Sequence, residues 1–489
     1  MDGKTRFNVK VIANILGVLL LMNAGFMAIC LPVSFYYKEE EWKAILLSAI
    51  ITASVGFLLR FSTRKLASKE LKKRDGYIVV TSGWIVMSIF GALPFILSGS
   101  IPNFTNAFFE TISGYTTTGA SILNDIESVP KSILFWRSFT QWIGGMGIIV
   151  LAVAILPFLG IGGMQLFVAE APGITPDKLQ PRIQDTAKRL WLIYVGLTLL
   201  EAILLYFGGM GMFDAVNHAL TTMATGGFST KNASAAYFDT PFIQYVLIVF
   251  MFLAGTSFTL TYYALKRNFK KITKNEEFIV YTVFTLVITV IVTITVMVVT
   301  ENSFEKSFRD SLFQVVSIIT TTGFVSADYT SWAPFLSVLF FILLLVGGSA
   351  GSTAGGVKII RHVVLFKNSF LELKRQLHPS AVLPVRISGK AIDQGVVSNV
   401  LAFIMIYILI FILGVILLST MNLDFTTAFG AVATTLGNVG PGIGNVGPLD
   451  NYYEIPTAGK WLLSFLMLLG RLELFTVLMI LTPHFWKRN

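Results

Sequence analysis

The sequence predicts an all-α polytopic membrane protein in which four span–short helix–span repeats follow an N-terminal two-helix hairpin. Three observations predict this fold class. Among 489 residues, 54% are hydrophobic and 13% are charged, and the mean hydropathy is +0.72, which is typical of chains that cross a bilayer many times. Long apolar runs follow one another along the chain, and a short segment between them occurs four times.

The repeated segment is a short, half-apolar run that closes on a glycine. Residues 106–119 align without gaps with 214–227, 310–323 and 427–440, and each copy is flanked by long apolar runs. A helix needs ~20 residues to cross the hydrocarbon core, so these shorter runs are typical of re-entrant half-helices. A repeat at a long period indicates a repeated architecture, and four equivalent units can surround one axis in pseudo-fourfold order.

The long apolar runs are interpreted as ten membrane spans, at residues 11–33, 44–61, 77–97, 133–159, 190–207, 242–265, 278–299, 335–366, 395–418 and 461–481. Most of the 37 Lys and Arg residues lie in the termini and in the loops on the same side as the termini. The positive-inside rule makes that side cytoplasmic and puts the four short segments on the outer side. The first run lacks a small-residue cleavage site, so we expect a retained span and not a signal peptide.

These spans divide the chain into five parts. The N-terminal hairpin covers residues 1–74, and the four repeats cover residues 75–165, 166–274, 275–390 and 391–489. The single cysteine excludes a disulfide framework and any multi-cysteine metal site, and the four histidines form no close-spaced ligand pair.

The four short segments end in related sequences: Thr-Thr-Gly-Ala at 117, Thr-Gly-Gly-Phe at 225, Thr-Thr-Gly-Phe at 321 and Asn-Val-Gly-Pro at 438. Glycine reaches backbone conformations that are closed to other residues, so successive carbonyl groups can turn to one side. A ring of such carbonyls can replace the water shell of a monovalent cation. One copy alone would be interpreted as a glycine-capped helix end, but four flanked copies favour an ion filter.

A glycine-rich stretch at residues 347–356 interrupts the apolar run 335–366. Five glycines in ten residues do not hold a stable helix, and non-helical backbone at membrane depth survives only against protein or water. The stretch is a candidate gate, and the alternative is that its glycines permit close helix packing. Residues 351–358 resemble a phosphate-binding loop, but they lack the Gly-Lys-Ser/Thr that this motif requires. Residues 442–447 match the glycine spacing of a dinucleotide-binding fingerprint, but they are not part of a βαβ unit.

Arg471 lies within the last apolar run, where an ionised side chain costs several kcal/mol unless it finds water or a partner. It is therefore expected to be functional, with helix packing through backbone carbonyls as the alternative. Glu473 projects from a different helix face and is not an obvious partner. Glu110 either adds negative potential behind the filter or is hydrogen-bonded to nearby backbone. Glu201 is a weaker candidate, and His218 is interpreted as structural.

Together these features resemble the bacterial Trk/Ktr/HKT superfamily of potassium translocation subunits, and most closely its Trk branch. The matching motifs are Trp-Arg-Ser at 136–138, Gln-Trp-Ile-Gly-Gly-Met-Gly at 141–147, the stretch 347–356 and Gly-Arg-Leu-Glu at 470–473. The hairpin 1–74 is similar to the Trk branch and not to the Ktr branch. The resemblance implies four covalently linked units around one pore in the bacterial cytoplasmic (inner) membrane, with both termini cytoplasmic.

The resemblance also implies the site residues. The K+ filter would comprise Thr117, Thr118, Gly119, Thr225, Gly226, Gly227, Thr321, Thr322, Gly323, Asn438, Val439 and Gly440. In the second repeat, Gly226 would be the filter glycine after a slip of one residue. Gly119 favours potassium, because some sodium-preferring plant relatives have serine there, whereas Asn438 and Val439 imply weaker discrimination against sodium. The gate would comprise Gly347, Gly348, Ser349, Ala350, Gly351, Ser352, Thr353, Ala354, Gly355, Gly356 and Arg471.

The expected function is potassium uptake, with K+ as the transported ion and no organic cofactor in this chain. The resemblance implies a homodimer that docks on a cytoplasmic ring of nucleotide-binding, TrkA-like regulatory subunits. The net charge of +10 is interpreted through its basic loops, which orient the chain in the membrane and attract anionic lipid head groups. It does not indicate nucleic-acid binding.

The alternative within the superfamily is a sodium-coupled or sodium-permeable cation carrier. A carrier with broken helices at the midplane is compatible with the stretch 347–356, although alternating access normally shows two-part symmetry. A membrane enzyme would need convergent acid–base groups or metal ligands at membrane depth, and the spans offer only scattered ones.

Overall fold

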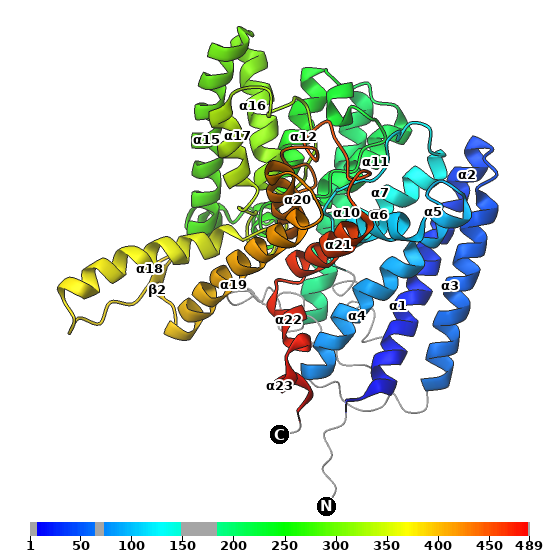
Figure 1. The fold of residues 1–489 in the computed structure, drawn as a ribbon. Coiled ribbons are helices and arrows are strands. Elements are labelled where there is room, and N and C mark those ends of the chain that lie inside the picture. Colours follow the sequence, from blue (N-terminus) through cyan, green and yellow to red (C-terminus); the bar gives the residue numbers. More distant parts are fainter. Residues whose placement is uncertain (1–6, 64–72, 148–182, 488–489) are drawn as a thin grey trace, which may run out of the picture.

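The computed structural model describes residues 7–63, 73–147 and 183–487, and these form helices with one short β-hairpin. Figure 1 shows the helices side by side in a bundle. The two ends of the described chain lie together, because the ring of Phe7 stacks on the ring of Phe485 at 5.6 Å between centroids. The termini therefore lie on one side of the bundle, as the sequence predicts.

The N-terminal hairpin consists of α1 (Val9–Ile29), the short α2 (Leu31–Tyr37) and α3 (Trp42–Thr63). It lies at the edge of the bundle opposite α15 (Glu276–Thr300) (Figure 1). Two glycines face each other where α1 and α3 pack. A Cβ on Gly17 would lie 2.7 Å from the carbonyl oxygen of Gly56, and a Cβ on Gly56 would lie 2.9 Å from that of Gly17. Small residues thus let the two backbones approach closely.

Each of the four repeats begins with a long helix and continues with a short one. The long helices are α4 (Lys73–Gly91, extended by α5, Leu93–Leu97), α10 (Ile183–Phe207), α15 and α19 (Gln394–Ser419). The short helices are α6 (Phe104–Tyr115), α11 (Met212–Met223), α16 (Phe304–Ile319) and α20 (Phe425–Gly437). The predicted half-helices are therefore present in all four repeats.

Polar side chains cap three of the short helices at their first turn. The side chains of Asn103, Ser303 and Asp424 accept hydrogen bonds from backbone N–H groups three residues later, at 3.1, 3.4 and 3.0 Å. Such caps satisfy N–H groups that have no partner inside the helix. Hydrogen bonds from the side chain and backbone of Thr427 lower the pKa of the Asp424 carboxyl.

In the second, third and fourth repeats, the helix that closes the repeat is divided into two parts. In the first repeat α7 (Lys131–Gly145) ends at Gly145, and the rest of the predicted span 133–159 lies mostly outside the described residues. The other three repeats have α12 (Pro241–Ala254) and α13 (Phe258–Leu265), α17 (Pro334–Leu343) and α18 (Ile359–Leu377), and α21 (Thr457–Arg471) and α22 (Phe475–Leu481).

The predicted spans at 242–265 and 461–481 are each broken into two helices, a feature that the sequence did not indicate. The axis turns by 107° between α12 and α13 and by 120° between α21 and α22. Six helices of the described chain are long and apolar enough to span a membrane, and eight if each bent pair is one span. Glu473 and Leu474, both at φ 54°, make the second turn, and their neighbours are apolar. Hydropathy does not register such a break, because it reports polarity and not backbone conformation.

In the third repeat, the glycine-rich stretch 347–356 separates two helices, as the sequence predicts, but the second helix is longer than expected. Helix α17 has only ten residues, and α18 begins after the glycine-rich stretch and continues eleven residues beyond the predicted end at 366. It projects sideways from the bundle beside the first part of α19 (Figure 1). Val364, Val385, Val397 and Val400 form a small apolar cluster there.

The remaining elements are short. They are η3 (Ser234–Tyr237), α14 (Phe269–Thr273), β1 (Arg386–Ile387), β2 (Lys390–Ala391) and α23 (Pro483–Trp486). Strands β1 and β2 are antiparallel, with Arg386 opposite Ala391.

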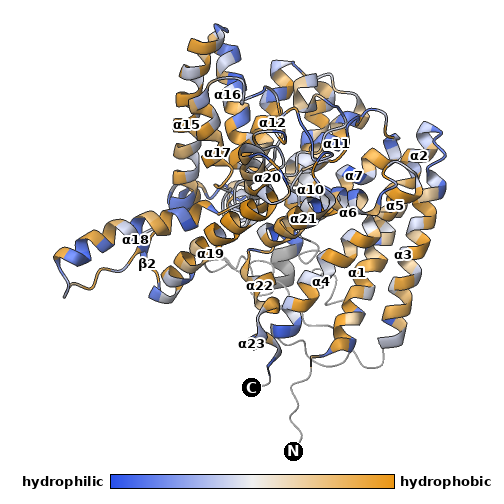
Figure 2. Ribbon diagram, viewed as in Figure 1, coloured by the Kyte–Doolittle hydropathy of each residue, from blue (hydrophilic) through white to orange (hydrophobic). Residues whose placement is uncertain are grey.

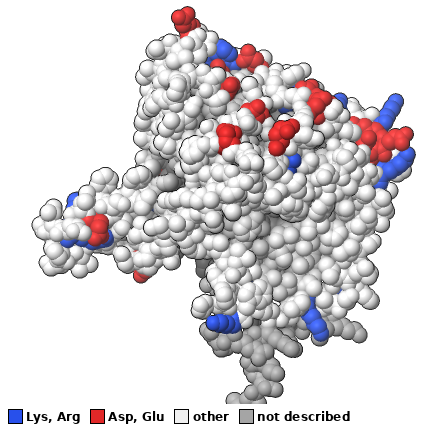
Figure 3. All heavy atoms as spheres, in the orientation of Figure 1, with Lys and Arg blue, Asp and Glu red and all other residues white. Residues whose placement is uncertain are grey.

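The surface of the bundle matches a membrane environment. Figure 2 shows apolar residues along the outer helices, and many apolar side chains of α15 and α19 are exposed, including Val283, Val290, Leu409 and Leu413. Acidic side chains gather at the end of the molecule opposite the chain termini (Figure 3). An apolar flank between polar ends is the surface that a bilayer requires.

Candidate functional site

The four Thr/Gly endings meet in a closed ring. A side chain on Gly119 would collide with the carbonyl oxygen of Gly226, one on Gly227 with that of Thr322, and one on Gly323 with that of Val439. The ring closes because a Cβ on Gly440 would lie 2.7 Å from the carbonyl oxygen of Thr118. Each ending thus touches the next in chain order, and the fourth touches the first. In every case the oxygen belongs to the residue directly before the next glycine.

The backbone repeats the same conformation in all four endings. Thr117, Thr225, Thr321 and Asn438 have φ between 53° and 56°, and the glycines two positions later have φ of 82°, 75°, 78° and 99°. Residues other than glycine seldom adopt positive φ, and clusters of such residues mark functional sites. The pattern also decides the open choice in the second repeat: Gly227, and not Gly226, corresponds to Gly119.

Side-chain hydrogen bonds brace the endings, and one of them joins the fourth ending to the first. The hydroxyls of Thr116 and Thr118 lie 2.8 Å apart, as do those of Thr320 and Thr322 in the third repeat. The second and fourth repeats lack this threonine pair. In the fourth, the Asn438 amide donates to Thr118 Oγ1 and to the carbonyl of Met467, both at 2.9 Å.

In the second repeat, the missing pair is replaced by a side chain from α7. Gln141 Nε2 donates to the carbonyl oxygen of Gly226 at 2.7 Å, and its Oε1 accepts from the N–H of Phe228 at 3.0 Å. In the sequence, Gln141 is part of the motif at 141–147, and nothing near it indicates a role of its own. Its contact with Gly226 spans 85 positions of the chain, so no local pattern could have indicated it.

The polar residues behind the ring are held by hydrogen bonds. Glu110 accepts from Arg137 Nε at 2.7 Å, from the Ser121 hydroxyl at 2.9 Å and from the Ile122 N–H at 2.8 Å. The expected hydrogen bond to nearby backbone is present at Ile122, whereas the sequence did not indicate the ion pair with Arg137. Arg137 also donates to the carbonyl of Ser229 at 3.0 Å, which joins the first repeat to the second.

The two other side chains weighed from the sequence are also buried. His218 lies with Nδ1 2.8 Å from the Asp214 carbonyl oxygen and Nε2 3.0 Å from the Ser229 hydroxyl. Both ring nitrogens are thereby occupied, as expected of a structural histidine. Glu201 is fully buried on α10.

The glycine-rich stretch 347–356 forms a loop between α17 and α18 that is bonded to the neighbouring repeats. The Ser349 N–H donates to the Gly255 carbonyl at 2.9 Å, where α12 breaks from α13. Thr353 Oγ1 donates to the carbonyl of Met223 at 3.0 Å, at the end of the second short helix. The Gly355 N–H donates to Thr321 Oγ1 at 2.7 Å, which ties the loop directly to the ring.

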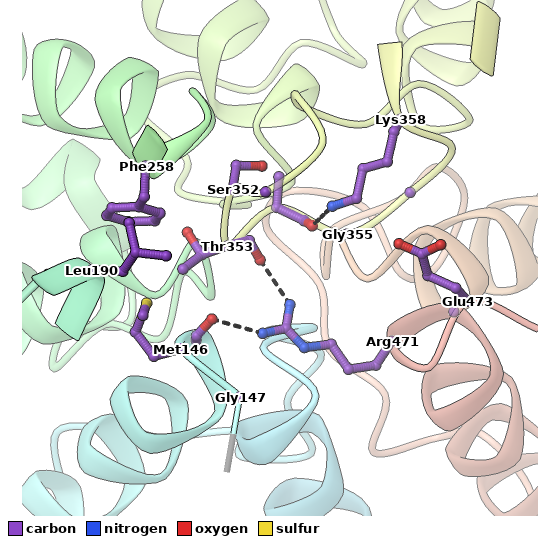
Figure 4. A pocket seen from close by; sticks show the side chains of 15 residues that line it. Met146, Gly147, Leu190, Phe258, Ser352, Thr353, Gly355, Lys358, Arg471 and Glu473 are labelled. Carbon is purple, nitrogen blue, oxygen red and sulfur yellow. Dashed lines mark hydrogen bonds between the residues drawn. The ribbon is translucent and has the colours of Figure 1, made fainter. Parts of the chain in front are cut away.

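Arg471 lies beneath this loop. Its Nη1 donates to the Thr353 carbonyl at 2.7 Å, and its Nη2 donates to the carbonyls of Gly144 and Gly145 at 2.6 and 2.9 Å. Gly144 and Gly145 end α7, and the carbonyl end of a helix attracts a cation. The guanidinium faces a cavity of about 180 Å³ lined also by Met146, Leu190 and Phe258 (Figure 4).

Further charged side chains flank the loop. Glu473 pairs with Arg361 at the start of α18, and Arg361 lies over the ring of Phe403 at 3.8 Å. Lys358 donates to the carbonyl of Ala354 within the loop (Figure 4). On the other side, Glu277 of α15 accepts from the Ala350 N–H at 2.7 Å. Both ends of the loop are therefore bound by charge-assisted contacts.

Four helical repeats that meet in a closed ring of backbone carbonyls, with a bonded loop and an arginine beside it, define a multi-pass membrane transport protein. The sequence profile described as "Cation transport protein" (TrkH) matches residues 41–487. The chain belongs to this TrkH family, whose members are transport proteins and not enzymes.

Known relatives match the chain along almost its whole length. It is 42% identical over 484 residues to the Trk system potassium uptake protein TrkH of Escherichia coli K12, covering 98% of this chain and 99% of that protein. Identity to the TrkH protein of Halomonas elongata is 39%, with 98% and 100% covered. The crystal structure of the potassium transporter TrkH from Vibrio parahaemolyticus matches with a TM-score of 0.88 at 38% identity, covering 98% of this chain and 100% of that chain. The resemblance and the all-α polytopic fold class are thus confirmed.

Proposed function

We propose that this protein carries out potassium ion uptake across the bacterial cytoplasmic membrane, through a selectivity filter built from its four repeats. The closed ring of the four endings carries the proposal, because in it a carbonyl oxygen of each repeat lies against a glycine of the repeat before it. Oxygens so placed can replace the water shell of K+, the transported substrate. The names of its relatives, potassium uptake proteins and a potassium transporter, support the choice of ion.

The filter would consist of the carbonyl groups of residues 117–119, 225–227, 321–323 and 438–440. Positive φ at the first and third residue of each segment supports this assignment, since alternation of backbone conformation turns successive carbonyls to a common side. The repeats that supply these segments would be 75–165, 166–274, 275–390 and 391–489, preceded by the hairpin 1–74.

The loop 347–356 and Arg471 would form the gate. The bond between Arg471 and Thr353 places a positive charge beneath the loop, and a fixed positive charge on the ion path opposes cation entry. Opening would require the loop to leave Met223 and Thr321, and Arg471 to leave the end of α7. A cytoplasmic regulatory subunit that pulled on α18 would act directly on this loop.

The termini would face the cytoplasm, because most lysines and arginines lie on their side of the membrane. We expect a homodimer bound to a nucleotide-binding, TrkA-like ring. The exposed apolar side chains of Phe366, Phe370, Leu373 and Leu377 on the projecting α18 support a protein contact there. Membrane lipids are the expected partners of the hollow lined by Lys270, Lys271, Lys274 and Lys390.

A sodium-permeable or sodium-coupled carrier of the same family is the second candidate. The fourth repeat favours this candidate, since Asn438 and Val439 stand where the first and third repeats have two threonines and make the ring less symmetric. Measured permeability to sodium relative to potassium separates the two.

The test is cation flux into liposomes that contain the purified chain, with potassium, rubidium and sodium compared for the wild type and Gly119→Ser. Gly119 has φ 82° and contacts the Gly226 carbonyl, so serine should distort the ring and shift flux toward sodium. Gly99→Ser is the matched control, since Gly99 also has positive φ (76°) but nothing lies within 4 Å of its Cβ position. Potassium flux that responds to Gly119→Ser and not to Gly99→Ser supports the filter, and equal selectivity in all three contradicts it.

A further inference from the structure

The second filter segment differs from the first and third in the residue before its glycine. Thr118 and Thr322 occupy that place in the other two, and each pairs with a threonine hydroxyl two residues earlier at 2.8 Å. The second segment has Gly226 there and Ala224 two residues earlier, so it has neither hydroxyl. Its own side chains cannot brace its backbone in this way.

Gln141 occupies the space that a side chain at 226 would need. A Cβ on Gly226 would lie 2.5 Å from Gln141 Oε1 and 2.7 Å from its Nε2, so glycine at 226 is matched to glutamine at 141. The amide makes one hydrogen bond on each side of Gly227, to the Gly226 carbonyl and from the Phe228 N–H. Gln141 is fully buried, and the Nε2 atom would lie 3.8 Å from a Cβ on Gly119, at the junction with the first segment.

We propose that Gln141 is a positioning residue for ion selectivity: it fixes the direction of the Gly226 carbonyl, which is the oxygen that the second repeat contributes to the ring. The proposal deepens the proposed function and depends on a carbonyl filter at these residues. A carbonyl oxygen has two lone pairs, so the amide can hold one while the other remains available to an ion. A buried amide with both ends bonded is rigid, and leaving its partners unsatisfied is costly.

Gln141 lies on the same helix, α7, as two residues that bind Arg471. Gly144 and Gly145, one turn further along the same helix, accept the hydrogen bonds of Arg471. A displacement of α7 when Arg471 leaves would therefore also move the amide that holds the Gly226 carbonyl. Helix α7 therefore contacts both the proposed filter, through Gln141, and the proposed gate, through Arg471.

The first experiment replaces Gln141 by leucine, which has similar size and no hydrogen bond, and measures potassium and sodium flux in liposomes. We expect the potassium-to-sodium permeability ratio to fall about fivefold, the change that loss of one ordinary hydrogen bond produces. Gln244→Leu is the control, because Gln244 is an equally buried glutamine that bonds Arg309 and the Phe238 carbonyl. A general effect of losing a buried amide would appear in both variants.

A second experiment does not depend on the stability of Gln141→Leu. Gly226→Ala should abolish flux, since its methyl overlaps Gln141, and Gln141→Ala on the same chain should restore part of it by clearing the space. Non-additive rescue of this kind measures direct coupling between the two positions. A double variant no better than Gly226→Ala alone would overturn the match between the two residues.

The outcomes separate this proposal from the proposed function. If Gly119→Ser shifts selectivity while Gln141→Leu keeps the wild-type ratio, the filter stands and the role of Gln141 is refuted. If neither variant shifts the ratio, the carbonyl filter itself fails. A lower melting temperature with an unchanged ratio would reduce Gln141 to a packing residue.

Discussion

The carbonyl oxygen of Thr353 accepts a 2.7 Å hydrogen bond from Nη1 of Arg471, which joins the glycine-rich loop of the third repeat to the broken span of the fourth. The same guanidinium binds the last carbonyls of α7 in the first repeat. Three repeats thus meet at one side chain. In the proposed gate, Arg471 holds the loop 347–356 in place, and the loop holds Arg471.

Replacing Arg471 by glutamine should weaken this closed arrangement. Hydrogen bonds from a charged donor contribute about 2 kcal/mol, which corresponds to about thirtyfold in an opening equilibrium. We expect faster rubidium flux into liposomes in the absence of any regulatory subunit. Arg375→Gln on α18, which removes an arginine paired with Glu372 and away from the loop, should leave the flux unchanged. Flux at the wild-type level in Arg471→Gln would exclude this arginine from holding the path closed.

Shortening the loop should open the pathway without unfolding the protein. Val346 and Val357, the residues that flank the loop, form an isolated β-bridge, and the Gly347 N–H donates to the Val357 carbonyl at 2.9 Å. The two ends lie side by side and run parallel, so a linker of about six glycines, long enough to turn the chain back, can replace residues 347–356. We expect regulator-independent flux with unchanged potassium preference, since the ring is left intact. A folded variant with no cation flux would show that another element closes the path.

Asn438 should be needed both for stability and for selectivity. It adopts φ 54°, which asparagine tolerates better than most residues, and its amide bonds Thr118 of the first repeat. Asn438→Leu is expected to lower the melting temperature and the potassium-to-sodium ratio together. Asn422→Leu is the matched control, because Asn422 also has positive φ (63°) but lies exposed in the turn after α19. A ratio reduced equally by both variants would argue against a specific role for Asn438.

Breaking the buried pair of Glu110 and Arg137 should destabilise the fold. The side chains are 0% and 2% exposed, and removing one partner of such a pair costs about 3–5 kcal/mol, because the other charge stays buried. Thermal unfolding in detergent should show a clear loss for Glu110→Gln. The exposed pair of Lys43 and Glu40 is the control, and Glu40→Gln should change nothing measurable. A tolerated Glu110→Gln would mean that water reaches Arg137.

Part of the candidate site could be predicted because its signal is local. The four Thr/Gly endings repeat along the chain, and the glycine-rich stretch and Arg471 interrupt apolar runs where such residues are costly. The partners of these residues could not be predicted in the same way. Thr321 bonds Gly355 over 34 positions and Arg471 bonds Gly144 over 327, and no periodicity connects residues so far apart.

The sequence by itself determined that the chain is a helical membrane protein with four related units, because apolar runs and repeats are properties of consecutive residues. Only the tertiary structure decided that the endings close into a ring, that Gly227 corresponds to Gly119 in the second repeat, and that two spans bend by more than 100°. Only the structure showed Gln141 in the place of a missing side chain. The physical reason is that packing between repeats, and not the polarity of any segment, sets these backbone conformations and contacts.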